Sequence, residues 1–346
     1  MRRTILAFLA ACTMMASPLP AFSAKNEAAV KKGAVKPAAK KTAGKKQAVK
    51  PATKSAKSSA GKKKTANRTT TKKKVAQKSA NPVRHVAVSD DPAHLAIQSS
   101  AALVLDQTTG KALVEKQPDA VLPIASISKL MTAMVVLDAG LDLNEIISIS
   151  HDDIDDLKGT RSRLPVGTTM TRETAMLLAL MSSENRAANA LGRHYPGGLP
   201  AFVAAMNRKA RSLGMFDSRF EEPTGLSSNN VSTAHDLARM VTAAARYPEI
   251  RMFSTTAEAK VELNGRIQNF GNTNALVRSE NWQIGVSKTG YISEAGRCLV
   301  MQAWVADKPV VIVLLDSQGK MTRVGDANRI KRWMESASLT KGARPV

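Results

Sequence analysis

Cysteine and aromatic residues are scarce in this sequence. The 346 residues include two cysteines, Cys12 and Cys298, and aromatic side chains make up 4% of the chain. Cys12 lies in an N-terminal segment that we expect to be removed, and Cys298 alone forms no intrachain disulfide, so a fold held together by disulfides is excluded. Beyond that N-terminal segment no apolar run reaches the roughly 20 residues of a membrane-spanning helix, so we expect no transmembrane helix in the mature protein.

Acidic residues are almost missing from one part of the chain. The formal net charge is +23, with 51 Lys+Arg against 28 Asp+Glu, and residues 25–84 hold 20 of these basic residues but a single acid, Glu27. From His85 onward the two signs nearly balance. The sequence therefore describes a nearly neutral body of about 260 residues, large enough for a real hydrophobic core, behind a strongly basic segment.

The first 24 residues have the pattern of an export signal. Arg2 and Arg3 precede an apolar run over residues 5–15, and Ala21, Phe22 and Ser23 satisfy the small-x-small rule for cleavage. We predict that residues 1–24 are a signal peptide and that the mature protein is in the periplasm. Residues 9–12 resemble a lipoprotein box, but the apolar stretch before Cys12 is too short to favour lipidation.

Residues 25–90 are predicted to be a disordered basic tail. Up to residue 84 this segment has no aromatic residue and no Leu, Ile or Met, so it cannot bury enough apolar surface to offset its loss of conformational entropy. Its composition resembles linker-histone tails, which bind DNA. Export removes nucleic acid as a partner, which leaves two interpretations open: a contact with anionic wall polymers or lipid head groups, and a solvated tether.

From about Leu95 the pattern becomes that of a folded domain, which we assign to residues 91–346. Apolar alternation predicts a hairpin of strands 101–105 and 112–114, and residues 127–139 are apolar enough for a buried helix. The same reasoning predicts helices at 171–181, 199–213, 234–246 and 327–336, a hairpin at 261–270, and strands at 285–288, 299–305 and 310–315. Strands at both ends with helices between them indicate an α+β fold with one antiparallel sheet.

Ser126 and Lys129 form the first of three candidate site motifs. A spacing of three residues at the start of a helix places both side chains on one helical face, as a nucleophile and its base require. The Ser-x-x-Lys pattern also occurs at Ser59, Ser317 and Ser338, so alone it carries little information. Only Ser126 begins an apolar helix, where the helix dipole favours negative charge and disfavours a protonated lysine.

Two further motifs follow in the chain. Ser183-Glu184-Asn185 lies in the break after the helix that ends near Met181, and by itself it is typical of a helix cap. Lys288-Thr289-Gly290 occurs once, at the end of a predicted strand, where Gly290 would permit close approach of a ligand backbone.

In this order and on these elements, the three motifs resemble those of the penicillin-interacting serine enzymes. The flanking residues 123–133 and 222–226 narrow the resemblance to the low-molecular-mass D-alanyl-D-alanine peptidases, over residues 95–338. One departure is Glu184, which replaces an aspartate at what we expect to be the least constrained position of its motif. The resemblance implies the penicillin-binding protein and β-lactamase-like transpeptidase fold, an antiparallel sheet flanked by helices with a helical subdomain between the motifs.

The resemblance also implies a role for each motif residue in acyl transfer on the D-alanine peptides of peptidoglycan. Ser126 is expected to attack a peptide carbonyl and form an acyl-enzyme. For Lys129 to accept the proton its pKa must fall from about 10.4 to near 7, and burial and the charge of Lys288 are expected to lower it. Ser183 would relay a proton to the leaving amine, and Asn185 would bind substrate or fix Lys129.

The remaining implied roles concern binding. Lys288, Thr289 and Gly290 are expected to bind the substrate carboxylate or the corresponding group of a penicillin-type inhibitor. The backbone N–H groups of Ser126 and Tyr291 are the expected oxyanion hole. No metal or other cofactor is required.

Other conspicuous residues receive structural interpretations. The histidines show no metal-ligand spacing, and these are His85, His94, His151, His194 and His235. The acidic cluster at 151–156 lacks the pattern of a calcium loop and is interpreted as a solvated helix start. Trp282 is assigned to packing, whereas a contact of Arg323 with a substrate carboxylate is left open.

Three alternatives are weighed against one another. A class A β-lactamase is disfavoured because its usual Glu-x-x-Leu-Asn segment is absent between Asn185 and Lys288. A non-catalytic wall-binding protein that acts through its tail does not need a nucleophile, a base and an anion site together, and these are Ser126, Lys129, Ser183 and Lys288. A carboxypeptidase with a second domain has no room in the 56 residues after Gly290, which favours the soluble D-alanyl-D-alanine endopeptidases that cut cross-links and keeps carboxypeptidase activity as the alternative.

Overall fold

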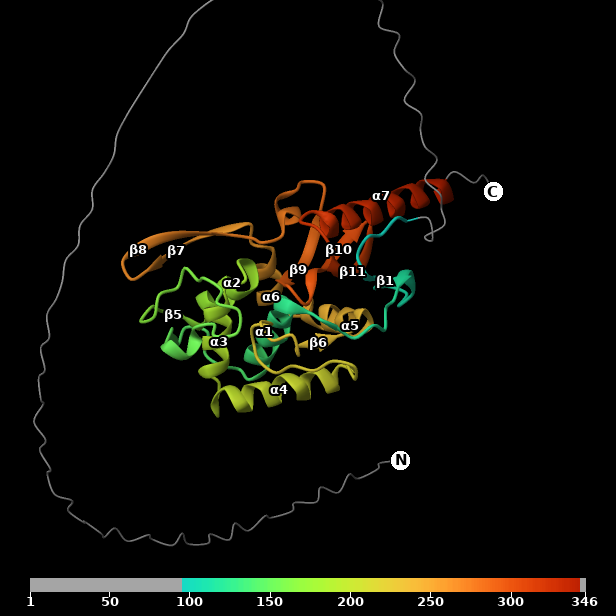
Figure 1. The fold of residues 1–346 in the computed structure, drawn as a ribbon. Coiled ribbons are helices and arrows are strands. Elements are labelled where there is room, and N and C mark those ends of the chain that lie inside the picture. The colour runs from blue at the N-terminus through green and yellow to red at the C-terminus, as the bar shows by residue number, and fades with distance from the viewer. Residues whose placement is uncertain (1–94, 343–346) are drawn as a thin grey trace, which may run out of the picture. The chain divides into compact units, whose positions relative to one another are not determined.

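The computed structural model describes residues 95–342 (Figure 1). The expected signal peptide at 1–24 and the expected basic tail at 25–90 lie outside these residues. Within the described part of the chain, no helix is both long enough and apolar enough to cross a bilayer.

A five-stranded antiparallel sheet is built from both ends of the described chain, as predicted. Its order is β2-β1-β11-β10-β9, so the first hairpin pairs with the last strand, with Ala101 opposite Leu315. The strands are β1 (Ala101–Asp106), β2 (Ala112–Lys116), β9 (Gln283–Ile292), β10 (Gly296–Val305) and β11 (Lys308–Ser317). Strand β9 therefore lies at one edge of the sheet.

Both faces of this sheet are covered. Alternate side chains point to opposite faces, so Leu103 and Val313 lie in one apolar core while Val104 and Ile312 lie in a second. Helix α7 (Thr322–Gly342) lies along β10 and β11 over the second core, and α5 (Ala234–Ala244) packs on the opposite face (Figure 1). Burial on both faces explains why the strands read as nearly continuous apolar runs.

A helical subdomain lies between the two groups of strands, also as predicted. The predicted buried helix begins as the 3₁₀ turn η2 (Ala125–Ser128) and continues as α1 (Lys129–Asp138). Thr171 caps the N-terminus of α2 and Thr233 that of α5 by accepting backbone N–H groups. The remaining helices are α2 (Arg172–Met181), α3 (Asn185–Arg193), α4 (Gly198–Ser212) and α6 (Pro248–Thr255).

Short strand pairs complete the fold. The hairpin predicted at 261–270 is present as β7 (Glu258–Leu263) and β8 (Arg266–Gly271). Asn264 and Gly265 form its turn, and both adopt the positive φ angles that a tight two-residue turn requires. The other pairs are β3 (Leu122–Pro123) with β6 (Val231–Ser232), and β4 (Ile146–Ser148) with β5 (Thr169–Thr171).

The sequence pattern did not predict two of the helices, α3 and α6. Helix α3 buries mostly alanines, so it lacks the large apolar residues that mark a helical face. Helix α6 has eight residues and starts at Pro248, which suits the first helical position.

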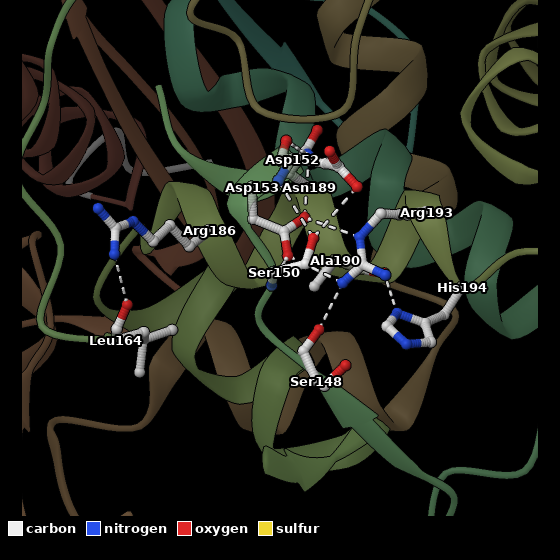
Figure 2. A network of polar contacts seen from close by, with 10 residues as sticks. All are labelled: Ser148, Ser150, Asp152, Asp153, Leu164, Arg186, Asn189, Ala190, Arg193 and His194. Atoms are coloured by element: carbon white, nitrogen blue, oxygen red, sulfur yellow. Dashed lines mark hydrogen bonds and ion pairs between the residues drawn. The ribbon is translucent and has the colours of Figure 1, made fainter. Parts of the chain in front are cut away.

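The expectation of a solvated helix start at 151–156 holds for most of the segment but is wrong for Asp153. The segment forms the 3₁₀ turn η3 (His151–Asp153), and the carboxylate of Asp153 is only 3% exposed. It is paired with Arg193 at 2.9 Å and accepts a hydrogen bond from Asn189 at 3.0 Å (Figure 2). A buried carboxylate needs such partners, so Asp153 fastens this loop to α3, while His151, Asp152 and Asp156 are exposed.

Candidate active site

The three sequence motifs meet at one cavity of about 270 Å³. Ser126 comes from η2, Ser183 from the connection between α2 and α3, and Thr289 from edge strand β9. The cavity is lined by Ser126, Thr160, Ser183, Asn185, Leu226, Thr273, Thr289, Gly290, Tyr291 and Arg323. Lys129 and Lys288 are buried next to it.

The turn that carries Ser126 is held in an unusual conformation. Ala125 has a φ of 50°, and Ser183 on the opposite wall has a φ of 62°. Positive φ angles at residues other than glycine are strained and persist only where the surrounding structure enforces them. They occur here on both sides of the cavity.

Two glycines allow the chain to close around this turn. A Cβ atom on Gly225 would lie 1.9 Å from the carbonyl oxygen of Ala125, and one on Gly290 would lie 2.9 Å from that of Ile124. Only glycine fits at such distances. We expected Gly290 to admit a ligand, and the structure gives it a further reason, because β9 passes directly beside the backbone of the Ser126 turn.

Lys129 reaches Ser126 as the spacing predicted. Its Nζ atom lies 2.9 Å from Ser126 Oγ, and it also donates to Asn185 Oδ1 at 2.7 Å and to the carbonyl oxygen of Thr224 at 2.6 Å. The fixed acceptors matter for the neutral amine, which has two N–H bonds and one lone pair. If Asn185 and Thr224 take both N–H bonds, the lone pair points at the hydroxyl of Ser126.

Burial is the main influence on the proton of Lys129. It lowers the pKa of Lys129 to about 7, against the opposing effect of three carboxylates, those of Glu222, Glu184 and Asp155. Of the two causes expected from the sequence, burial is the one that lowers this pKa. The neutral amine is therefore well populated near neutral pH.

Lys288 is also fully buried, and it contacts Ser183 on the wall opposite Ser126. Its Nζ atom donates to Ser183 Oγ and to the carbonyl oxygen of Thr289, both at 2.9 Å. Burial and then the charge of Lys129 hold the pKa of Lys288 well below its usual value. A negative group in the cavity would reverse this shift by stabilising the ammonium form.

Arg323 adds a permanent positive charge at the same wall. Its Nη1 atom donates to the carbonyl oxygens of Gly290, at 2.9 Å, and Cys298, at 3.1 Å. These contacts hold the guanidinium beside β9, where it lines the cavity. Its placement next to Lys288 makes this wall suited to bind a carboxylate.

Glu184 is not the loosely constrained residue that we expected. Its side chain is 6% exposed and accepts hydrogen bonds from Arg163 Nε at 2.9 Å and Ser162 Oγ at 2.7 Å. The expectation was wrong because the middle residue of the motif points away from the cavity into a polar contact with the preceding loop.

The sequence did not indicate several residues that complete the site. Thr160, Thr273 and Leu226 line the cavity, and Thr273 Oγ1 lies 2.7 Å from Thr289 Oγ1. Thr160 and Thr273 stand in irregular segments with no periodicity to mark them. The contact of Thr224 uses its backbone carbonyl, which no sequence pattern reveals.

The interpretation of Trp282 is tested by the fold. Trp282 is buried and donates from Nε1 to Asn328 at 3.0 Å, which confirms its packing role. Among residues 95–342 no three His, Cys, Asp or Glu side chains gather as a metal site would need.

The fold and this cavity place the chain among the serine D-alanyl-D-alanine peptidases and transpeptidases. The crystal structure of a Streptomyces DD-transpeptidase matches with a TM-score of 0.64 and 27% identity, over 69% of this chain and 97% of that one. Residues 85–319 match the family model described as D-alanyl-D-alanine carboxypeptidase, and the chain belongs to this family.

Two relatives in this family share almost half of the aligned residues. A D-alanyl-D-alanine endopeptidase of Pseudomonas aeruginosa is 49% identical over 251 residues, which cover 72% of this chain and 81% of the relative. A D-alanyl-D-alanine endopeptidase of Escherichia coli is 48% identical over 245 residues, covering 70% and 79%.

Proposed function

We propose that this protein is a serine D-alanyl-D-alanine endopeptidase that cleaves peptidoglycan cross-links through an acyl-enzyme on Ser126. The observation that carries the proposal is the environment of Lys129, a buried amine with two fixed acceptors and Ser126 in its third direction. The names of the two relatives support the endopeptidase form of the activity.

In the first step Lys129 accepts the proton of Ser126, whose Oγ attacks the carbonyl carbon of a D-alanine residue. Negative charge then develops on the carbonyl oxygen, and the backbone N–H groups of Ser126 and Tyr291 stabilise it. Their proximity is supported by Gly290, on which a Cβ atom would lie 3.2 Å from the Ser126 nitrogen.

In the second step the carbon–nitrogen bond of the adduct breaks, and the leaving amine departs with the proton that Lys129 took from Ser126, so that Lys129 is neutral again. Ser183 relays this proton, since its hydroxyl lies at 2.9 Å from Lys288 Nζ and lines the cavity. Water then attacks the acyl carbon while Lys129 takes its proton, and Lys129 returns this proton to Ser126 Oγ as the ester bond breaks. The products are two separated peptides and the free Ser126 hydroxyl.

Electrostatic attraction between the substrate carboxylate and the positive side chains of the cavity wall holds the substrate. A carboxylate near Thr289 would meet Lys288 and Arg323, and Asn185 offers an amide at the opposite wall. A penicillin presents a carboxylate and a reactive amide carbonyl of the same kind, so we propose that it acylates Ser126 as an inhibitor.

The test of this function is incubation of the purified protein with cross-linked muropeptides, followed by chromatography and mass spectrometry. We expect dimers to fall to monomers without release of free D-alanine. The family description supports D-alanyl-D-alanine carboxypeptidase as the second candidate. Release of D-alanine from pentapeptides with dimers left intact would establish that activity instead.

We further propose that the enzyme acts in the periplasm as one peptidase domain, residues 91–346, after removal of a signal peptide at 1–24. The basic segment at 25–90 would attract anionic wall polymers through its charge, with no role for nucleic acid. The rival in which the chain is only a wall-binding protein predicts no covalent reaction with penicillin.

A further inference from the structure

A threonine outside the three motifs contacts the active site. Thr160 lies in the loop after η3, and its side chain lines the cavity. Its Oγ1 atom is 2.6 Å from Asp155 Oδ2 and 3.0 Å from Asn185 Nδ2. A hydroxyl has one proton to donate, and a carboxylate only accepts, so Thr160 donates to Asp155 and accepts from Asn185.

Several hydrogen bonds fix the orientation of the Asp155 carboxylate. Its carboxylate accepts backbone N–H groups from Leu157 and Lys158 at 2.9 Å and from Thr160 at 2.8 Å, besides the Thr160 hydroxyl. Although partial burial opposes it, these hydrogen bonds lower the pKa of Asp155 below its usual value. The group is therefore ionised at neutral pH and keeps the proton of Thr160 turned toward itself.

The contact with Thr160 determines which way the amide of Asn185 points. With Nδ2 on Thr160, Oδ1 faces Lys129 Nζ at 2.7 Å. The reversed amide would set an N–H₂ group against the N–H of Lys129 and lose both hydrogen bonds. The orientation of Asn185 in turn fixes one N–H of the neutral Lys129 amine, and so the direction of its lone pair.

The loop that carries Asp155 and Thr160 is tied to the helix that begins at Asn185. On one side of α3, Asn189 and Arg193 hold the η3 turn, and Arg186 donates to the carbonyl oxygen of Leu164 at 2.8 Å (Figure 2). A spacing of three and four residues places these side chains on one helical face. Lys158 also pairs with Glu294 in the β9–β10 turn. The loop and Asn185 therefore form one fixed unit.

We propose that Thr160 and Asp155 are positioning residues for acyl transfer, which act through Asn185 to keep the amine of Lys129 directed at Ser126. This inference depends on the proposed function of Ser126 and Lys129. Neither residue belongs to the three motifs.

The experiment compares acylation rates of purified variants with a fluorescent penicillin. Thr160→Val keeps the size and shape of the side chain but loses the hydroxyl, and we expect acylation to slow by on the order of tenfold. Thr160→Ser restores the hydroxyl and should restore most of the rate. Equal rates for Thr160→Val and the parent would overturn the proposal.

A double-mutant cycle separates positioning from a direct contact with the ligand. If Thr160 acts through Asn185, Thr160→Val should have no further effect in an Asn185→Ala background. The same fold-loss in both backgrounds would show that Thr160 acts independently, against the proposal. If the parent protein does not label at all, the proposed function itself fails, so the two failures are distinguishable.

The pH profile tests Asp155. The charged groups around Lys129 are Glu222, Glu184 and Asp155, which raise its pKa, and Lys288 on β9. Asp155→Asn should therefore slow acylation and also move its acid limb to lower pH. Asp152→Asn removes the same charge from an exposed neighbour and should change neither. A profile for Asp155→Asn identical to that of Asp152→Asn would contradict the assignment.

Discussion

Lys129 and Lys288 are both fully buried, and each Nζ atom lies 2.9 Å from a serine hydroxyl, that of Ser126 and that of Ser183. Burial penalises the charged form of each amine and lowers the pKa of both lysines, which favours the neutral form beside each hydroxyl. In the proposed mechanism one pair acts at the attacking hydroxyl and the other at the leaving amine.

Replacing Ser126 should abolish the covalent reaction without unfolding the protein. Ser126→Ala removes one hydroxyl that lies at the cavity surface, so we expect no labelling by fluorescent penicillin and an unchanged melting temperature. Ser212→Ala, on the exposed side of α4, serves as the matched control and should label normally. Labelling of the Ser126→Ala variant at the parental rate would assign the nucleophile elsewhere.

The acylation rate should rise with pH through about 7. The active form of Lys129 is the neutral amine, and burial lowers the pKa of Lys129 to about 7, so protonation below that pH removes the base. Lys129→Ala should slow acylation by roughly 10² to 10⁴ and lose this dependence on pH. Stopped-flow measurement between pH 5 and 9 provides the check, and a flat profile for the parent would argue against Lys129 as the base.

Glu222 should influence both the stability of the site and its pH dependence. Its carboxylate accepts the backbone N–H groups of Thr224 and Gly225 at 2.6 Å and so shapes the loop that contacts Lys129. Glu222→Gln turns an N–H₂ group toward these donors, and we expect a loss of about 1–3 kcal/mol in unfolding free energy.

The same variant should move the acid limb of acylation to lower pH, because Glu222 is the first of the three carboxylates that raise the pKa of Lys129. Urea denaturation and the pH profile measure the two effects. Glu221→Gln is the matched control, since it removes a neighbouring charge whose contacts are with Arg219, Ser227 and Asn229. Equal behaviour of the two variants would refute the role of Glu222.

Deletion of residues 25–84 should separate wall binding from catalysis. This segment has 20 basic residues, one acid and no aromatic anchors, so any attraction to wall material is diffuse and is screened once the Debye length falls below about 8 Å. Turnover of small muropeptides should stay unchanged, while retention on intact sacculi weakens and loses its salt dependence. Equal retention of both proteins at every salt concentration would reduce the segment to a spacer.

Much of the fold was predictable from the sequence because its signals are local. Short apolar runs indicated β1, β2 and β11, and the Asn264 and Gly265 turn indicated the β7–β8 hairpin. Helix α3 was not predicted because its buried residues are small and its polar face contacts the η3 loop instead of water. The burial of Asp153 and Glu184 was not predicted for a different reason. Each carboxylate is paired with an arginine of another segment, which no local pattern indicates.

The sequence by itself determined the family, the order of its three motifs and the three-residue spacing that brings Ser126 and Lys129 together. A local spacing on a helix fixes a distance, so such a contact needs no knowledge of the rest of the chain. The resemblance implied a pKa of Lys129 near 7 and a contact with Asn185. Only the tertiary structure decided that burial is what lowers this pKa, that the carbonyl oxygen of Thr224 also accepts from Lys129, and that Thr160 contacts Asn185. Burial and hydrogen bonds to backbone or remote side chains depend on segments up to about a hundred residues apart, and no local pattern records them.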